Sequence, residues 1–240
     1  MTAVFISDLH LRIDNPLTIK GFIRFLDTVV SKAKVLYILG DFFDYYIGDD
    51  DCNLLYEIIV NALIKLHNKK ILCYFIHGNR DFLLNKQFAK ASNILLLPYK
   101  KVIYLYNKNI FITHGDIFCM NDISYQYYRK FIHNCYIQKI FLSLPLFMRH
   151  YIAKKMRFYS KHVSYKTNSN RFDINQNDLN YIYKTYNVNY IIHGHTHCPS
   201  VYKININGEK VYRYVLGAWE KHGYYVKVSK DFIKLCKFYF

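Results

Sequence analysis

Val35-Leu-Tyr-Ile-Leu-Gly-Asp-Phe-Phe-Asp44 is the stretch of sequence on which the predicted fold depends. Val35 to Leu39 form a short apolar run that ends at Gly40, which is the pattern of a buried strand followed by a turn. The carboxylate of Asp41 is therefore expected at the carboxyl end of a strand, where open α/β sheets bind their ligands. A single aspartate after a strand is usually a turn or cap residue, so this stretch alone does not identify a site.

Four further apolar runs end in a similar way. Each is followed by aspartate, asparagine or histidine beside a glycine or a tight turn. Turns favour glycine, asparagine and aspartate but do not need histidine, so the repeated pairing of oxygen and imidazole groups favours metal ligation over turn chemistry. The four stretches are Asp8-Leu-His10, Gly78-Asn79-Arg80-Asp81, His114-Gly-Asp116 and His193-Gly-His-Thr-His197.

The side chains at these strand ends can hold a pair of divalent metals. Two ions roughly 3.5 to 4 Å apart need terminal oxygen and nitrogen ligands and one carboxylate that bridges them. Neutral imidazole with carboxylate suits Mn, Fe or Zn better than Ca or Mg, and the lack of cysteine in the set argues against a structural zinc. Any one of these histidines could be structural, but all of them together are not. The candidate ligands are Asp8, His10, Asp41, Asn79, His114, His195 and His197.

The remaining elements indicate an α/β protein. With 240 residues, the chain is long enough for one well-buried domain over 1–240, or for a core domain that carries an insertion. Asp49-Asp-Asp51 could bind a metal, but acidic residues just ahead of a helix more often complement its positive end, which we favour for the helix over 54–67. We predict helices over 17–30, 54–67 and about 177–186, hairpin turns at 107–109 and 207–208, and final strands over 224–228 and 232–240.

Residues 123–172 differ from the rest of the chain in charge, because they include ten Lys or Arg and no Asp or Glu. We predict that this segment is a helical lid insertion with one apolar and one basic side. A basic amphipathic helical pair can lie on an anionic membrane surface or clamp an anionic, partly apolar ligand. An ordinary solvated helical hairpin is the alternative interpretation.

The overall charge also favours anionic partners. The formal net charge is +16, which suits nucleic acid, an acidic lipid surface or a phosphorylated substrate, although compositional drift toward Lys, Asn, Tyr, Ile and Phe would explain it too. Six cysteines without regular spacing suggest a reducing compartment rather than a disulfide framework or a zinc ribbon. We expect no secretory signal and no membrane span, because the apolar stretch 140–148 is far short of the ~20 residues that a spanning helix needs.

In chain order, the five strand-end motifs resemble the signature blocks of the calcineurin-like metallophosphoesterases. The resemblance implies a β-sandwich of two mixed sheets packed face to face and flanked by helices. The longer strings 40–49, 78–82, 114–116 and 193–199 resemble the family of UDP-2,3-diacylglucosamine pyrophosphohydrolases (diphosphatases), and this resemblance covers nearly the whole chain, lid included. That family cleaves UDP-2,3-diacylglucosamine to UMP and 2,3-diacylglucosamine 1-phosphate (lipid X) in lipid A biosynthesis.

The resemblance also implies roles for particular residues. Two metals, typically Mn²⁺, would lie on either side of a bridging Asp41, and a hydroxide between them would attack phosphorus while Arg80 neutralises charge on the phosphoryl oxygens. One metal would be held by Asp8, His10, Asp41 and His197, and the other by Asp41, Asn79, His114 and His195. The implied catalytic residues are Asp41, Asn79, Arg80 and His114.

Arg80 is informative about the bond that is cleaved. Many relatives have a histidine after this asparagine, which protonates an alkoxide leaving group, and arginine cannot give up its proton. A phosphate leaving group does not need that proton, so Arg80 fits cleavage of a pyrophosphate better than of a phosphodiester. A structural salt bridge with Asp81 or Asp116 is the alternative role.

The resemblance further implies substrate contacts in the lid and a location at the membrane. Ser164 and Thr167 depart from the usual Asn and Lys, and Lys166 lies one position early, so contacts there require Lys166 to rotate or the lid to shift. We expect a peripheral protein on the cytoplasmic side of the inner membrane, with no nucleic acid and no obligate protein partner. The implied substrate-binding residues are Asn79, Arg80, Asp122, Ser160, Ser164, Lys166, Thr167 and His195.

Two other functions are compatible with parts of the sequence. A metal-dependent nuclease or nucleotide phosphodiesterase would suit the net charge, but Arg80 in place of histidine and the apolar side of the lid argue against it. A non-catalytic binding scaffold would have lost metal ligands, and every ligand position is intact here.

Overall fold

The computed structural model of the chain describes residues 2–118, 123–166, 176–206 and 208–240, and it contains two mixed β-sheets. The first sheet has six strands in the order β11-β10-β1-β2-β3-β4. β1 to β4 are parallel to one another, whereas β10 and β11 are antiparallel to their neighbours. The strands are β1 (Ala3–Ile6), β2 (Val35–Ile38), β3 (Leu72–Phe75), β4 (Leu95–Leu96), β10 (His222–Val228) and β11 (Ile233–Tyr239).

The second sheet has five strands in the order β5-β6-β7-β9-β8. β7 is parallel to both of its neighbours, and the outer pairs β5–β6 and β8–β9 are the two predicted hairpins. The first hairpin turns one residue earlier than predicted, at Tyr106 and Asn107, because both adopt the left-handed φ that a two-residue hairpin turn requires. The strands are β5 (Lys100–Leu105), β6 (Lys108–Thr113), β7 (Tyr190–His193), β8 (Ser200–Ile206) and β9 (Glu209–Val215).

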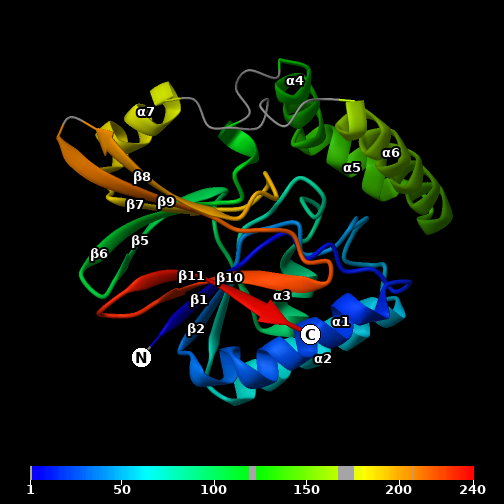
Figure 1. Ribbon diagram of the computed structural model, residues 1–240. Coiled ribbons are helices and arrows are strands. Elements are labelled where there is room, and N and C mark those ends of the chain that lie inside the picture. Colours follow the sequence, from blue (N-terminus) through cyan, green and yellow to red (C-terminus); the bar gives the residue numbers. More distant parts are fainter. Residues whose placement is uncertain (1, 119–122, 167–175, 207) are drawn as a thin grey trace.

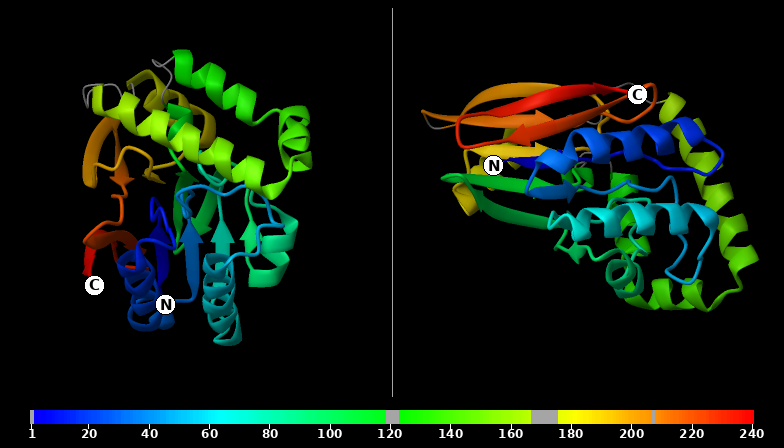
Figure 2. Two further views of the ribbon diagram at one scale, coloured as in Figure 1. Left: turned by 90° about the vertical axis from the view of Figure 1, so that its right-hand side faces the viewer. Right: turned by 90° about the horizontal axis from the view of Figure 1, so that it is seen from below.

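The two sheets pack face to face with helices on their outer faces, as Figure 1 shows. Phe5, Ile76, Ile112, Ile192 and Leu216 are fully buried between the sheets. Helices α1 (Pro16–Thr28), α2 (Leu54–Asn68) and α3 (Lys86–Ser92) pack on the first sheet, and α7 (Gln176–Tyr186) packs on the second (Figures 1 and 2). The predicted sandwich of two mixed sheets flanked by helices is therefore confirmed.

The acidic triplet that precedes α2 does not complement that helix, so the prediction for it was wrong. Asn53 takes the cap position, and its side chain accepts a hydrogen bond from the backbone N–H of Tyr56 at 3.0 Å. Asp49 instead accepts hydrogen bonds from the backbone N–H groups of Gln87 and Phe88, at 2.9 and 3.1 Å. Its charge thus complements the start of a different helix, α3, because the chain folds back between the two helices.

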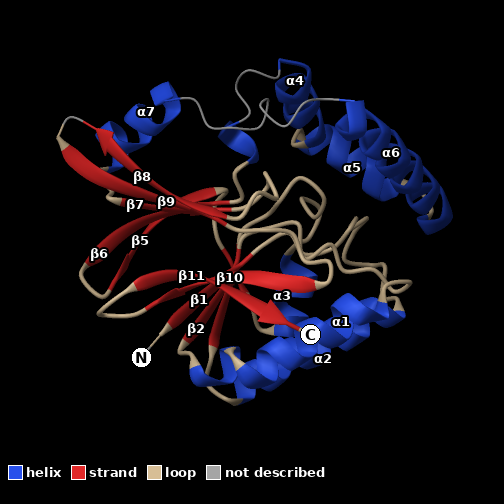
Figure 3. Ribbon diagram, viewed as in Figure 1, coloured by secondary structure: helices blue, strands red, loops and turns tan. Residues whose placement is uncertain are grey.

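The basic segment forms three helices rather than the expected helical pair: α4 (Ile123–Ile132), α5 (Cys135–Ser143) and α6 (Leu146–Lys166). Pro145 separates α5 from α6, because proline has no backbone N–H to continue a helix. The three helices lie over the loops that leave the carboxyl ends of the strands (Figure 3). Residues 167–172 of the predicted insertion lie outside the described residues. Within the described ranges, no helix is long and apolar enough to span a membrane.

Candidate metal centre

The loops that follow five strands bring all the candidate ligands to one edge of the sandwich. Three of these strands belong to the first sheet and two to the second. The structure shows the predicted convergence at the carboxyl ends of the strands. Every candidate ligand lies within four residues of the last residue of its strand. The ligands are Asp8 and His10 after β1, Asp41 after β2, Asn79 after β3, His114 after β6, and His195 and His197 after β7.

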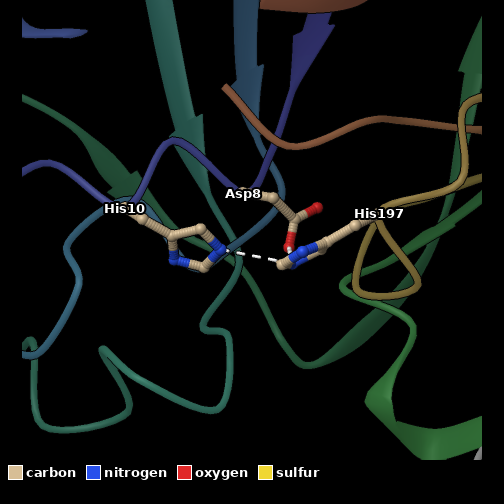
Figure 4. Close-up of side chains that lie close together, drawn as sticks. All are labelled: Asp8, His10 and His197. Carbon is tan, nitrogen blue, oxygen red and sulfur yellow. Dashed lines mark hydrogen bonds and ion pairs between the residues drawn. The ribbon is translucent and has the colours of Figure 1, made fainter. Parts of the chain in front are cut away.

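Asp8, His10 and His197 form a first group, drawn in Figure 4. His10 Nε2 lies 3.2 Å from His197 Nε2, and His197 Nε2 lies 3.3 Å from Asp8 Oδ1. Asp8 Oδ2 accepts a hydrogen bond from the backbone N–H of His195 at 3.0 Å, whereas Asp8 Oδ1 is buried and accepts none within the described structure. Two ring nitrogens and a carboxylate oxygen thus converge at distances that suit a shared cation.

Asn79, His114 and His195 form a second group. Asn79 Oδ1 lies 3.0 Å from His114 Nε2 and 3.1 Å from His195 Nδ1, and the two ring nitrogens are 3.2 Å apart. His114 Nδ1 donates a hydrogen bond to the Leu39 carbonyl at 2.8 Å, so Nε2 of the neutral ring carries a lone pair. That lone pair faces the oxygen atoms of Asn79 and Asp41, so either a proton on Nε2 or a cation between these atoms makes the arrangement favourable.

Asp41 lies between the two groups and reaches each with a different oxygen. Its Oδ2 is 4.0 Å from His10 Nδ1, and its Oδ1 is 3.6 Å from His114 Nε2. The His10 nitrogen near Asp41 is the one opposite the nitrogen that faces His197, but ligand atoms of Asp8, Asp41 and His114 all lie within 4.8 Å of one another. Asp41 could therefore contribute to both groups, as a bridging carboxylate must. The set of carboxylate, amide and imidazole donors, with no thiol in it, fits the pair of divalent ions that the sequence predicts.

The electrostatics of the centre reflect its burial among negative charges. Burial alone would lower the pKa of His114, but the charges of Asp41, Asp8 and Asp116 more than offset it and raise the pKa to about 9. Burial and the charge of His114 lower the pKa of His195 to about 3, so this ring is neutral, as a metal ligand must be. The raised pKa of His114 shows that the surrounding carboxylates favour positive charge at this position.

Asp81 holds two ligand loops in position. Its carboxylate accepts hydrogen bonds from the backbone N–H groups of Phe42 and Gly78, both at 2.7 Å, so it joins the loop that carries Asp41 to the loop that carries Asn79. Burial and the nearby charge of Asp41 raise the pKa of Asp81 to about 7. The support that Asp81 gives to the ligand loops was not predicted from the sequence. Its partners are backbone N–H groups, one of them 39 residues away at Phe42 and the other in the tight turn at Gly78, and neither leaves a pattern in the sequence.

A family model of the calcineurin-like phosphoesterases matches residues 1–199, which include all the ligands described above. The chain belongs to the calcineurin-like phosphoesterase family. Family membership, together with full-length relatives that are named as hydrolases, establishes that it is a metal-dependent hydrolase.

Several relatives of this phosphoesterase match it along their whole length. A protein of Proteus mirabilis (strain HI4320) named UDP-2,3-diacylglucosamine hydrolase is 47% identical, with 100% of each chain covered. Proteins of the same name from Photorhabdus laumondii subsp. laumondii and Salmonella agona (strain SL483) are 46% and 43% identical, with 100% and 99% of each chain covered. A solved structure of an archaeal phosphodiesterase is 12% identical and covers 100% of each chain with a TM-score of 0.51, which shows the shared fold alone.

Arg80 of this phosphoesterase contacts the metal centre directly. Its backbone N–H donates to Asp41 Oδ1 at 3.0 Å, and its side-chain Nε lies 3.1 Å from Asp41 Oδ2. Its NH1 donates to Asp44 Oδ1 at 2.9 Å. Among the described contacts, Arg80 does not form the alternative salt bridge with Asp81 or Asp116: Asp81 binds backbone groups, and Asp116 binds Arg129.

Three arginines of α4 and α6 pair with aspartates of the sandwich. Arg129 Nε donates to Asp116 Oδ2 at 2.6 Å. Arg149, which is only 2% exposed, binds both carboxylate oxygens of Asp50 and the Ile47 carbonyl. Arg157 Nε donates to Asp44 Oδ1 at 2.8 Å. Since residues 123–172 contain no acidic residue, every carboxylate that pairs with these helices comes from outside that segment.

The predicted lid contacts are only partly described. Asp122 and Thr167 lie outside the described residues. Ser160, Ser164 and Lys166 belong to α6, but their side chains also lie outside what the structure describes. The sequence reasoning missed Asp44 and Arg157. Asp44 ends the stretch that predicted the fold and could have been singled out there, whereas the partner of Arg157 is 113 residues away and leaves no local signal.

Proposed function

We propose that this phosphoesterase hydrolyses the pyrophosphate bond of UDP-2,3-diacylglucosamine to UMP and 2,3-diacylglucosamine 1-phosphate (lipid X), a step of lipid A biosynthesis. The main support is Arg80, which contacts Asp41 at 3.1 Å and follows Asn79 at the motif position where many relatives have the histidine that protonates an alkoxide leaving group. The full-length relatives with the matching name favour the same substrate.

In this proposal, the seven candidate ligands divide between two metal ions. One metal would be held by Asp8, His10, Asp41 and His197, and the other by Asp41, Asn79, His114 and His195, with Mn²⁺ as the expected ion. Bound metals would supply the Lewis acidity that activates water and neutralises charge on phosphorus.

Arg80 would stay protonated throughout and would stabilise negative charge on the phosphoryl oxygens and on the departing phosphate. Its backbone N–H and its Nε both contact Asp41, so little reorganisation is needed when charge develops. Asp81 would keep the loops of Asp41 and Asn79 in register through its two backbone hydrogen bonds.

We further propose that α4–α6 act as a lid that receives the acyl chains and the sugar, with Asp122, Ser160, Ser164, Lys166 and Thr167 joining Asn79, Arg80 and His195 at the substrate. Large apolar side chains are exposed on these helices, among them Tyr136 (72%), Phe147 (73%) and Phe158 (62%). Exposed aromatic groups among basic residues also favour peripheral binding to an anionic bilayer, here the cytoplasmic face of the inner membrane.

The test is product analysis of UDP-2,3-diacylglucosamine in H₂¹⁸O with Mn²⁺, by phosphorus NMR and mass spectrometry. We expect equimolar UMP and diacylglucosamine 1-phosphate, with ¹⁸O on a single phosphorus. Bis-p-nitrophenyl phosphate and single-stranded DNA serve as alternative substrates, and Asp41→Asn is the inactive control. Cleavage of the diester or the DNA without release of UMP would leave a metal-dependent hydrolase and remove the lipid substrate from the proposal.

Binding to vesicles tests the proposed location. Co-sedimentation with vesicles that contain phosphatidylglycerol should exceed that with neutral phosphatidylcholine vesicles, and it should fall as salt rises. Phe147→Ser should weaken the binding to both kinds of vesicle. Equal binding to both kinds of vesicle would contradict a basic membrane-facing surface.

A further inference from the structure

Asp44 joins the metal centre to helix α6. It lies in the loop after β2, three residues beyond Asp41, and its side chain is only 4% exposed. One of its oxygens, Oδ1, accepts from Arg80 NH1 at 2.9 Å and from Arg157 Nε at 2.8 Å, and Arg157 NH2 lies 2.8 Å from the same atom. Its backbone N–H donates to the Leu11 carbonyl at 3.2 Å, so the main chain beneath this carboxylate is fixed.

The two guanidinium groups would repel each other without this carboxylate. Both are partly buried, with side chains 18% and 20% exposed, so water screens their charges less than it would at the surface. A third guanidinium, that of Arg12, has NH1 4.0 Å from Asp44 Oδ2. The negative charge of Asp44 therefore makes the close approach of Arg80 and Arg157 favourable.

The two arginines are not equally free to move. Arg80 belongs to the core, where its backbone N–H binds Asp41 and its carbonyl accepts from the Tyr46 N–H at 3.0 Å. Arg157 is carried by α6, whose position over the centre depends on contacts between separate elements. Arg149 of α6 stays bound to Asp50, so when the charge of Asp44 is removed the repulsion is relieved by displacement of Arg157 and the part of α6 around it rather than of Arg80.

We propose that Asp44 is a positioning residue that holds α6 closed over the metal centre by pairing Arg157 with Arg80. The proposal rests on the proposed function for the substrate used in its kinetic test. Asp44 does not touch the ligand atoms in the described contacts, and it acts through the two arginines. Its charge thus governs how firmly the closed enzyme holds a substrate, while the chemical step depends on Asp41 and its neighbours.

The decisive variant is Asp44→Asn, which keeps the size of the side chain and removes its charge. With UDP-2,3-diacylglucosamine in detergent micelles and Mn²⁺, we expect KM to rise about tenfold and kcat to change less than about threefold. The metal content should stay at the wild-type value. Hydrogen exchange of α6, measured without substrate, should become faster. Asp27→Asn is the matched control, because it removes the same charge from an exposed pair with Lys69 and should change none of these quantities.

A double-mutant cycle identifies the route of the effect. Arg157→Gln removes the repulsion together with the pair, so Asp44→Asn should add little to KM in the Arg157→Gln background. Additive effects of the two substitutions, or unchanged KM and unchanged exchange of α6 in Asp44→Asn, would overturn the proposal.

The role of Asp44 can be tested even if the Asp44→Asn variant does not fold or if the proposed substrate is wrong. If Asp44→Asn does not fold, Arg157→Gln alone decides, because faster exchange of α6 is expected there and normal exchange would refute the pairing. If wild-type protein does not cleave the lipid substrate, the proposed function fails, whereas the exchange of α6 in Asp44→Asn still confirms or overturns the role of Asp44.

Discussion

Single residues at the metal centre adopt backbone conformations that few side chains tolerate. Asp8, His10, Asp41, His195 and His197 have φ between 49° and 69°. This left-handed region costs roughly 1–2 kcal/mol for a residue with a Cβ, and such residues are typical of functional sites. Backbone hydrogen bonds between neighbouring loops, such as that from the His10 N–H to the Asp41 carbonyl at 3.0 Å, hold these conformations. The ligand types could be predicted from the sequence, but the strain comes from contacts between loops and could not.

Gly194 illustrates how closely these loops pack. A Cβ at this position would collide with Ser7 Oγ and with the carboxylate of Asp8. We therefore expect Gly194→Ala to displace Asp8, to lower bound metal below one ion per chain and to reduce kcat/KM more than about 100-fold. Metal analysis and steady-state kinetics measure both effects. Gly208→Ala is the control: its φ of 87° makes alanine strain the turn between β8 and β9, but no atom lies within 4 Å of the added Cβ, so the metal centre is not touched. Equal metal loss in both variants would contradict this interpretation.

At the level of elements, short-range patterns were predicted correctly and long-range pairings were not. The predicted helices over 17–30, 54–67 and 177–186 and both hairpins follow from apolar spacing and turn residues within about 15 positions, and the structure forms them with small shifts in their ends. Helix α3 was not predicted, and the basic segment forms three helices rather than a pair. The partner of Asp49 could not be predicted in this way, because its charge meets the N-terminus of α3 rather than of the adjacent α2. The pairs Arg149–Asp50 and Arg157–Asp44 join positions 99 and 113 residues apart, so they too depend on the assembled fold.

The cap on α3 gives a prediction about stability. Asp49 accepts three backbone N–H groups, from Asn85, Gln87 and Phe88. We expect Asp49→Ala to lower the free energy of unfolding by about 2 kcal/mol, since these donors lose their partner at the helix start. Urea denaturation measures this. Glu57→Ala, at an exposed position of α2, should lower it by less than about 0.5 kcal/mol, and a similar loss in the two variants would count against the cap.

In the whole molecule, the candidate metal ligands come from loops of both sheets. Asp8, His10, Asp41 and Asn79 follow strands of the first sheet, whereas His114, His195 and His197 follow strands of the second. Each ligand group contains residues from both sheets: His197 lies 3.3 Å from Asp8, and His114 lies 3.0 Å from Asn79. Bound metals would thus link the two sheets as well as serve the reaction. The order of the motifs in the sequence does not show this link, because it does not say to which sheet each strand belongs.

This arrangement predicts that removing metal destabilises the folded sandwich. Without cations, the buried carboxylates of Asp8 and Asp41 repel each other, and the links between the sheets are lost. At Mn²⁺ about 100-fold above its Kd, binding contributes about 2.7 kcal/mol. For a chain of this size, we therefore expect EDTA to lower Tm by about 5 to 10 °C and excess Mn²⁺ to restore it. Scanning calorimetry measures the shift, and Asp41→Asn should show much less of it. A Tm that is the same with EDTA and with Mn²⁺ would mean that the sheets are held by the apolar core alone.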